Sequence, residues 1–317
     1  MDFVVQIIQS EAQKGIQLIS ASNITVVIPT YGREQVLVDT LSSLIAMKTT
    51  PYEILLIDQT PAHEPATSAY LEQNKGFVRR VTFSPPSIPH AMNQGLLRAN
   101  TDYLLYLDDD IIPDENLIAS LVAALNDFDT PPSCVAGQVI QPDEQVISFE
   151  SWTRNWFPFN SDKRQFIEEV MAGNLCVNRM FALDIGGFDE NFKGSAYRFE
   201  SDFARRTVRA GGNILFEPSI SMHHLRSERG GTRSKGHHLT TWRPHHSVGK
   251  YYYAFRGGLR EAVKTVLIQP LRAIRTKHHL RSPWWIPVSL CAELLGIFWA
   301  LALLLKGPGL LDRTRQD

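Results

Sequence analysis

A buried-strand pattern that runs directly into three carboxylates constrains this chain more than any other feature. Residues Tyr103–Leu107 are apolar or aromatic, and Asp108, Asp109 and Asp110 follow without a break. Side chains of an extended chain alternate between two faces, so Asp108 and Asp110 point the same way, roughly 6.6 Å apart. Hard cations such as Mg²⁺ or Mn²⁺ take oxygen ligands of this kind. The pattern therefore predicts a divalent metal site on Asp108 and Asp110.

A structural role for these aspartates is the alternative. Aspartate also caps helices, and the Pro-Asp-Glu-Asn sequence at residues 113–116 has the form of a helix start. One aspartate would satisfy such a cap, whereas three adjacent carboxylates at the edge of a core need a cation. We therefore favour a metal, with substrate phosphates and water as its remaining ligands.

The composition excludes several classes of protein. Lys and Arg (32) nearly balance Asp and Glu (33), and this gives no indication of bulk nucleic-acid binding. Cys134, Cys176 and Cys291 are widely spaced without a Cys-x-x-Cys pair, which disfavours a disulfide framework or a zinc site. The N-terminus lacks the basic and apolar regions of a secretory signal, so we expect catalysis in the cytoplasm.

Strands and helices alternate from residue 24 onward. Four short apolar runs have the pattern of buried strands, at residues 24–29, 53–57, 76–83 and 103–107. The segments between them are expected helices, at residues 35–47, 66–75 and 90–100. This order is typical of a doubly wound, mostly parallel α/β sheet flanked by helices, with ligands at the carboxyl ends of the strands. Asp58 and the three consecutive aspartates lie at such ends.

The second half of the chain is less regular. We expect a strand at 134–140, a segment at 172–177 that precedes a helix at 179–185, a helix at 200–210 and a last core strand at 214–216. An N-terminal helix within residues 1–22 is only weakly indicated. The aromatic loop with Trp152, Trp156, Phe157 and Phe159 would either pack on the core or form a wall for an acceptor.

Together these segments resemble the family 2 glycosyltransferases, inverting enzymes with the Rossmann-like, nucleotide-sugar-binding GT-A fold. The resemblance covers residues 24–233: the segment at 26–33, Leu56-Ile57-Asp58, the His-Ala-Met-Asn-Gln-Gly helix start at 90–95, the Asp-x-Asp pair and the Gly-Gly-Phe-Asp-Glu turn at 186–190. By this resemblance, the residues that bind the nucleotide sugar are Pro29, Thr30, Tyr31, Arg33, Asp58, Asn93, Asp108, Asp109, Arg229 and Arg233.

The acidic helix departs from the family pattern. The family often has Glu-Asp-x-Asp-Leu, whereas residues 199–203 are Phe-Glu-Ser-Asp-Phe, which places Glu200 at the position of the usual catalytic aspartate. An inverting transfer needs one base to take the proton of the acceptor hydroxyl, and glutamate can serve. Asp202 is the alternative base, in which case Glu200 would only cap the helix or pair with Arg205 or Arg206. Glu200 is favoured.

A histidine pair and three arginines follow the last expected strand. The resemblance implies that His224 joins Asp108 and Asp110 on the metal. It also suggests that Arg229 and Arg233, separated by two glycines, wrap the diphosphate. The structural alternatives are a core histidine with satisfied hydrogen bonds and a solvated basic loop.

The C-terminal segment is apolar and basic. Residues 286–305 just reach the length that crosses a bilayer, and two tryptophans precede them. Pro287, Glu293 and Gly296 disfavour a straight span, so a re-entrant or surface-lying helix remains open, as does a helical hairpin packed on the domain. The basic residues between Arg256 and Arg281 are interleaved with apolar ones, as on an anionic membrane surface, and place the domain on the cytoplasmic side.

We therefore expect an N-terminal extension at 1–23, a GT-A domain at 24–245 and a membrane-associated helical segment at 246–317. The expected enzyme is an inverting, hexosyl-type glycosyltransferase at the cytoplasmic face of the cell membrane, in polysaccharide or glycolipid synthesis. It would use Mg²⁺ or Mn²⁺, a nucleotide-sugar donor, with a UDP-sugar as the first choice, and a glycan or lipid-linked acceptor. No nucleic-acid partner is expected.

Two other functions fit part of the pattern. A phosphohydrolase with an aspartate nucleophile also uses Asp-x-Asp, but it needs the motif on an early strand with a hydroxyl residue soon after. Ile111-Ile112-Pro113 follow here instead. A non-catalytic binding protein on the same fold is the other alternative, and Phe199 is its only indication.

Overall fold

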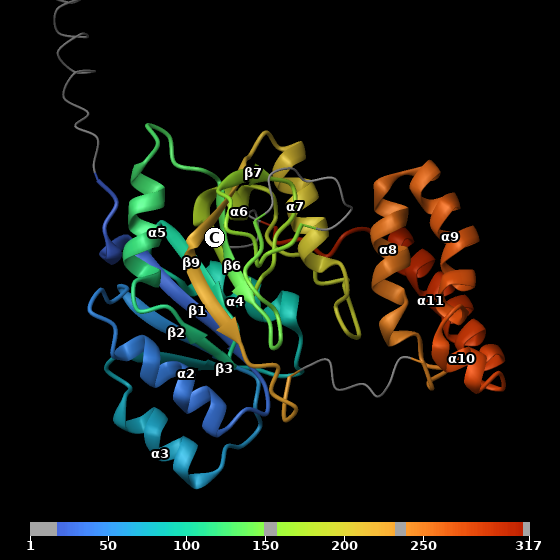
Figure 1. Cartoon of the computed structure of the whole chain (residues 1–317), viewed down its shortest axis with the longest axis horizontal. Coiled ribbons are helices and arrows are strands. Elements are labelled where there is room, and N and C mark those ends of the chain that lie inside the picture. The colour runs from blue at the N-terminus through green and yellow to red at the C-terminus, as the bar shows by residue number, and fades with distance from the viewer. Residues whose placement is uncertain (1–17, 149–156, 232–238, 313–317) are drawn as a thin grey trace, which may run out of the picture.

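The structure, a computed structural model, describes residues 18–148, 157–231 and 239–312. In these ranges a central sheet is flanked by helices, and a bundle of C-terminal helices lies to one side (Figure 1). The expected N-terminal helix lies mostly outside the described residues, as do Trp152, Trp156 and Arg233.

The first half of the sheet is parallel, as predicted. Its strands are β1 (Ile24–Thr30), β2 (Glu53–Asp58), β3 (Val78–Thr82) and β4 (Tyr103–Leu107), in the spatial order β3-β2-β1-β4. The helices between them are α2 (Gln35–Ile45), α3 (Pro65–Gln73) and α4 (Ile88–Arg98). Every residue of β4 is buried, so both faces of the sheet are covered there.

Beyond β4 the sheet is mixed. The remaining strands are β5 (Ile111–Pro113), β6 (Cys134–Ile140), β7 (Gln165–Ile167), β8 (Asn174–Asn178) and β9 (Ile214–His224). β8 runs antiparallel between β4 and β6, where the sequence indicated only a segment before a helix. β9 is parallel to β6 and continues well past the expected end at residue 216, because a register shift between Gly137 and Gln138 lets the pairing resume.

The expected helices at 179–185 and 200–210 correspond to α6 (Arg179–Asp184) and α7 (Phe199–Arg209), whereas α5 (Leu117–Asn126) follows the helix start that the sequence indicates only as the alternative role of the aspartates. The side bundle comprises α8 (Val248–Gly257), α9 (Leu259–Ile274), α10 (Lys277–Arg281) and α11 (Trp285–Lys306). The short 3-10 helices η1 (Ala21–Asn23) and η2 (Pro244–His246) precede β1 and the bundle.

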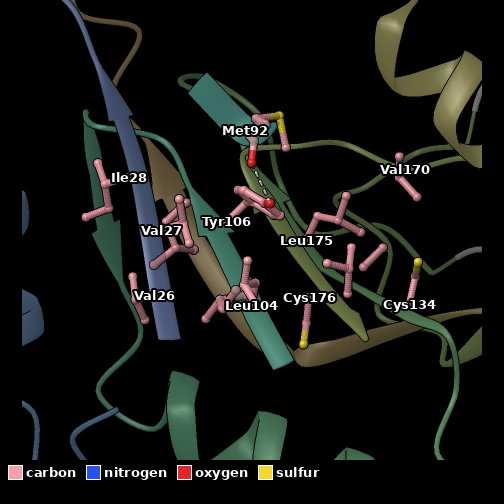
Figure 2. Packing of buried hydrophobic residues seen from close by; sticks show 14 of the residues in the cluster. Val26, Val27, Ile28, Met92, Leu104, Tyr106, Cys134, Val170, Leu175 and Cys176 are labelled. Atoms are coloured by element: carbon pink, nitrogen blue, oxygen red, sulfur yellow. Dashed lines mark hydrogen bonds between the residues drawn. The ribbon is translucent and has the colours of Figure 1, made fainter. Parts of the chain in front are cut away.

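The core fills the space between the sheet and the helices that cover it, α4 among them. Figure 2 shows Tyr106 of β4 directed at Met92 of α4, where its hydroxyl donates to the Met92 carbonyl at 2.8 Å. The described part of the aromatic loop packs on the core as well. Phe157 and Phe159 are buried with ring centroids 4.7 Å and 6.2 Å from that of Phe216. Phe157 and Phe159 therefore pack on the core, which is the first of the two roles considered for this loop.

Gly95 permits the close approach of α4 to β1. A Cβ at this position would lie 2.7 Å from Cγ1 of Val27 and 3.3 Å from the ring of Tyr106. We expect Gly95→Ala to lower the free energy of unfolding by about 1–3 kcal/mol, because the core must shift to admit the methyl group. Urea denaturation measures this. Gly76→Ala is the control, since no atom lies within 4 Å of its new Cβ, and equal losses at both positions would contradict the packing argument.

Candidate active site

Asp108, Asp110 and His224 form a cluster at the carboxyl end of β4. Each offers one ligand atom, and the three atoms lie within 4.8 Å of one another. Nε2 of His224 is 3.2 Å from Oδ1 of Asp110 and 3.6 Å from Oδ2 of Asp108. Carboxylate oxygens suit Mg²⁺ and Mn²⁺, and imidazole is a common metal ligand. The structure thus brings together the three residues predicted to hold a metal.

The pairing of β5 with β9 explains how His224 reaches the aspartates. β5 begins directly after Asp110, and its residue Ile111 pairs with His224. The N–H of Leu225 donates to the carbonyl of Asp110 at 2.8 Å, and the N–H of Ser227 donates to its Oδ2, also at 2.8 Å. His224 is therefore placed by strand register, and the chain that follows it encloses Asp110.

The charges of the cluster suit a cation. Burial lowers the pKa of His224, but the hydrogen bond to Asp110 and the charges of both carboxylates outweigh burial and raise it. Burial raises the pKa of Asp110, yet His224 and Arg33 lower it overall. Nδ1 of His224 lies 2.9 Å from Oε1 of Gln141, an oxygen that can only accept. Nδ1 therefore carries a hydrogen, and Nε2 is directed at the carboxylates, as in metal-binding histidines.

Asp109 points into the protein interior. Its carboxylate accepts hydrogen bonds from the hydroxyl of Thr30 at 2.7 Å and from Nε of Arg33 at 3.1 Å. Burial raises the pKa of Asp109 to about 6, although Arg33 and Thr30 counteract it. Pro29, the residue of β1 before Thr30, pairs in register with Ile57 of β2. These residues tie β1 to its neighbours, and their contacts with a donor stay predictions.

Asp58 is fully buried at the end of β2. Its Oδ2 lies 2.9 Å from Nε2 of His63 and 2.7 Å from Nε of Arg80, and its Oδ1 accepts from the N–H of Thr60 at 2.8 Å. Nδ1 of His63 lies 3.3 Å from the carboxylate of Glu34. The sequence pattern did not identify His63, Arg80 and Glu34 as partners of Asp58. Their only sequence signal is that they are polar residues in or close to strands of the sheet. Contact of Asp58 with a nucleotide base stays a prediction.

The loop after β9 packs against the turn after β1. The N–H of Gly231 donates to the carbonyl of Tyr31 at 2.7 Å, and Nη1 of Arg33 donates to the carbonyl of Arg229. The guanidinium of Arg229 is exposed and pairs with Glu64 at 2.7 Å. Arg229 thus lies at the exposed edge of the site, where its guanidinium can leave Glu64 and bind another anion.

Glu200 lies in the first turn of α7 and reaches the same edge as the metal cluster. Its Oε1 accepts a hydrogen bond from the N–H of Ala172 at 2.8 Å. The next residue, Gly173, accepts the N–H of Asp108 at 3.2 Å, and any side chain on Gly173 would collide with the Asp108 carboxylate. Two adjacent residues therefore connect Glu200 to the cluster. The N-terminus of α7 also favours the charged carboxylate.

Asp202, the alternative base, is only 1% exposed. Its carboxylate lies 2.8 Å from Nε of Arg206, 3.2 Å from Nε of Arg256 and 3.8 Å from Arg205. The arginines expected as partners of Glu200 thus pair with Asp202. A buried carboxylate whose oxygens are held by these arginines is not accessible to an acceptor hydroxyl. The arrangement favours Glu200, and the assignment of the base stays a prediction.

Glu169 is a second carboxyl group beside Glu200 that sequence reasoning did not single out. Its Oε2 accepts from the hydroxyl of Ser201 at 3.3 Å. Burial raises the pKa of Glu169, with a further contribution from the charge of Glu200, and Arg198 only partly counteracts these effects. No motif marked residue 169, because its position depends on how β7 and α7 pack.

Asn93 of α4 holds the turn at residues 186–190. Its side-chain N–H group donates to the carbonyl of Phe188 at 2.8 Å and to Glu190 at 2.9 Å, and its Oδ1 accepts from the N–H of Phe188 at 2.8 Å. Asn93 is fully buried. Its side chain serves the turn in this structure, and the predicted contact with the donor would require the turn to release it.

Comparison with known proteins bears on the identity of this site. The sequence model of glycosyl transferase family 2 matches residues 25–186, just over half of the chain. The chain belongs to glycosyl transferase family 2. Poly-beta-1,6-N-acetyl-D-glucosamine synthase of Staphylococcus aureus strain COL is 30% identical over 94 residues, which are 29% of this chain. The match spans only 23% of that synthase, less than a quarter of its length.

Solved structures share the fold of this family 2 glycosyltransferase. Staphylococcus aureus TarS in complex with UDP-GlcNAc superposes with a TM-score of 0.56 at 14% identity, over 84% of this chain and 79% of that chain. GalNAc-T7 with UDP, GalNAc and Mn²⁺ gives a TM-score of 0.54 at 19% identity, over 76% of this chain and 51% of that chain. At such identities the likeness shows the fold alone, which is the predicted GT-A fold.

In this family 2 glycosyltransferase the turn at 186–190 is also tied to the C-terminal helices. Asp189 is fully buried and accepts from the hydroxyl of Tyr252 at 2.9 Å, from the N–H of Gly309 at 2.9 Å and from Arg256. Arg256 of α8 also pairs with Asp202 of α7. One guanidinium thus neutralises two buried carboxylates that belong to different elements.

Arg256→Met tests the weight of this shared ion pair. The substitution leaves Asp189 without its cation and Asp202 with fewer, so we expect the free energy of unfolding to fall by about 3–5 kcal/mol. Urea denaturation monitored by circular dichroism measures the change. Arg260→Met on the exposed surface of α9 is the matched control and should change stability by less than about 0.5 kcal/mol. Similar losses in the two variants would contradict the proposed weight.

Proposed function

We propose that this glycosyltransferase moves a sugar from a nucleotide-diphosphate donor to an acceptor hydroxyl with inversion at the anomeric carbon. The observation that carries the proposal is the convergence of Asp108, Asp110 and His224 with Glu200 on either side of residues 172–173. A site for a cation and a partly exposed carboxylate thus share one edge of the sheet, which suits departure of a diphosphate and activation of a hydroxyl at neighbouring points.

The donor is assigned to the side formed by β1, β2 and β4. UDP-sugars are the first choice, and two structural neighbours that were solved with a nucleotide sugar support such a donor: TarS with UDP-GlcNAc, and the mannosyltransferase PcManGT from Pyrobaculum calidifontis with GDP-Man and Mn²⁺. PcManGT has a TM-score of 0.50 at 16% identity, over 96% of this chain and 86% of that chain. Asp58 would seat the base, while Arg229 would leave Glu64 for the diphosphate, with Arg233 as the second proposed arginine.

The chemistry is a single displacement in which this chain supplies a base and fixed charges. Mg²⁺ or Mn²⁺, when held by Asp108, Asp110 and His224, would neutralise the charge of the departing diphosphate. Glu200 accepts the proton of the acceptor hydroxyl as its oxygen attacks the anomeric carbon, and the Ala172 N–H fixes one carboxylate oxygen while this happens.

We place the acceptor, a glycan or a lipid-linked sugar of the hexosyl class, at the cytoplasmic face of the cell membrane. One helix in the described ranges, α11, is long and apolar enough to cross a membrane, with a mean hydropathy of 2.2. The matched Staphylococcus aureus protein is named as a polysaccharide synthase, which supports a role in cell-surface polysaccharide or glycolipid synthesis. We also propose that the chain divides into an N-terminal extension at 1–23, a GT-A domain at 24–245 and a membrane-associated segment at 246–317.

The two alternative functions are a phosphohydrolase and a binding protein without turnover. Family membership argues against a phosphohydrolase with an aspartate nucleophile, whose chemistry requires the aspartate to stand free for attack. Asp110 instead lies 3.0 Å from Nη2 of Arg33 and 3.2 Å from His224. A binding protein without turnover is separated from an enzyme by the experiments that follow.

Removal of one metal ligand should abolish metal-dependent donor binding. Calorimetry of the purified chain with UDP, GDP, dTDP and CMP, each with Mn²⁺ and then with excess chelator, should show one nucleotide that binds only with metal. Asp110→Asn should weaken that binding at least about tenfold, since even changes outside the ligand shell cost this much. Asp129→Asn, at an exposed aspartate, is the control. Absence of binding by every nucleotide would overturn the nucleotide-sugar proposal.

Substitution of each acidic residue of α7 should identify the base. Glu200→Gln should reduce sugar transfer to a membrane extract by about 10²-fold or more, because a general base contributes that much, while nucleotide affinity and stability stay unchanged. Asp202→Asn should mainly lower stability, since it leaves arginines unpaired. Glu168→Gln at an exposed neighbour is the control. Full transfer by Glu200→Gln together with inactive but stable Asp202→Asn would reverse the assignment.

A further inference from the structure

Helices α9 and α11 present apolar side chains that no described residue covers. On α9, Leu259 is 81% exposed and Leu267 is 67% exposed, and on α11, Phe298 is 67% and Leu305 is 89% exposed. Further exposed apolar residues on the two helices are Val263, Leu271, Leu294, Leu301 and Leu304. We call this set the α9–α11 face. It belongs to the bundle that stands beside the sheet (Figure 1).

An open apolar groove runs between the two helices. Its volume is about 550 Å³, and the residues that line it include Leu259, Val263 and Leu267 of α9 and Ile297, Leu301 and Leu304 of α11. The apolar lining of this groove lacks the convergent polar groups that orient a small polar ligand. It matches hydrocarbon, which needs contact area without direction.

The same bundle carries many exposed cations and few free acids. Its exposed basic residues are Arg260, Lys264, Arg272, Arg275, Lys277, Arg281 and Lys306. Between residues 248 and 306 the sequence has only two acids, Glu261 and Glu293. Glu261 pairs with Arg205 at 3.1 Å, and Glu293 is buried against the hydroxyl of Tyr251 at 2.5 Å. Within the described residues, the helices that carry the apolar face therefore also carry positive charge that exceeds their acids.

We infer that the α9–α11 face docks on an anionic lipid surface and enters one leaflet. Apolar side chains accompanied by lysine and arginine are the pattern of helices that lie in the interface of an anionic membrane, and the exposed Trp284 at the start of α11 suits the headgroup level. A second copy of this chain is disfavoured as the occupant, because pairing would bring two positively charged bundles together. The inference rests on the membrane placement proposed above and adds residues, lipid charge and depth.

The helix α11 does not cross the bilayer in this arrangement, because the chain after it is bound to the catalytic domain and its own backbone is bound to the residue that precedes α8. After α11, the carbonyl of Gly307 accepts from Asn191 at 2.6 Å, and the N–H of Leu311 donates to the carbonyl of Gly186 at 2.9 Å. Along α11, the hydroxyl of Ser247 donates to the carbonyl of Ala292 at 2.9 Å. A spanning α11 would have to break these contacts and place the buried Glu293 in hydrocarbon.

Co-sedimentation of the full chain with lipid vesicles tests the docking. We expect binding to phosphatidylcholine vesicles that contain phosphatidylglycerol, little binding to pure phosphatidylcholine, and release by high salt. The double variant Leu267→Glu, Phe298→Glu should bind at least about tenfold more weakly, because it places two carboxylates in the apolar face. Phe77→Glu, at a phenylalanine that is 63% exposed on the catalytic domain, is the matched control and should bind as the wild type.

The following measurements decide the result. Calorimetric binding of UDP with Mn²⁺, measured without vesicles, should be equal in the variant and the wild type, so loss of docking is separable from failure of the donor proposal. Unchanged vesicle binding by the double variant would overturn the docking face, as would a wild-type dimer that the variant converts to a monomer. Washing cell membranes with alkaline carbonate should release the protein. If the protein instead stays in the membrane and a tag on its C-terminus lies on the side opposite the catalytic domain, the single-leaflet arrangement is overturned.

Discussion

The guanidinium of Arg33 is the contact on which the arrangement of the site depends. Consecutive carboxylates at the end of a buried strand repel one another strongly where water is excluded. Arg33 is 8% exposed and donates to Asp109 at 3.1 Å and to Asp110 at 3.0 Å, which divides its charge between a residue that faces the interior and one that faces the cluster. Its third nitrogen donates to the carbonyls of Ser227, at 2.8 Å, and of Arg229. The same cation therefore fixes the loop that follows His224.

Sequence patterns predicted the part of the fold that depends on local periodicity. The strands up to β4 follow from short apolar runs, and the pairing of Asp108 with Asp110 follows from alternation along one strand. The rest depends on long-range register. β9 contains Pro218, which argues against a strand interior, yet a shift beside Gly137 in β6 lets it continue to His224. Asp58 ended a recognisable strand, but its partners His63 and Arg80 come from a loop and from β3, which no spacing rule connects.

The C-terminal bundle is part of the catalytic architecture. Arg256 on α8 neutralises Asp189 in the turn held by Asn93 and Asp202 on the helix that carries Glu200, and Glu261 on α9 pairs with Arg205 of that same helix. Buried carboxylates of this kind tolerate few conformations, because each loses its compensation when the cation moves. The position of α7 is thereby coupled to the bundle. Ion pairs therefore cross the proposed boundary at residue 245.

This coupling gives the lipid-facing surface a consequence for the choice of acceptor. α8 carries Arg256 toward α7 and packs Tyr251 against Glu293 of α11, and Glu261 of α9 pairs directly with Arg205 of α7. The helices of the docking face are therefore coupled to the helix of the proposed base. A bundle held in one leaflet would then set the height of Glu200 above the lipid surface. The hydrogen bond from the N–H of Ala172 further restricts the carboxylate of Glu200, which can therefore reach only an acceptor hydroxyl close to its position. Acceptors would be selected by the distance of their hydroxyl from the membrane as well as by contacts with the sugar, which favours a lipid-linked acceptor over a free glycan.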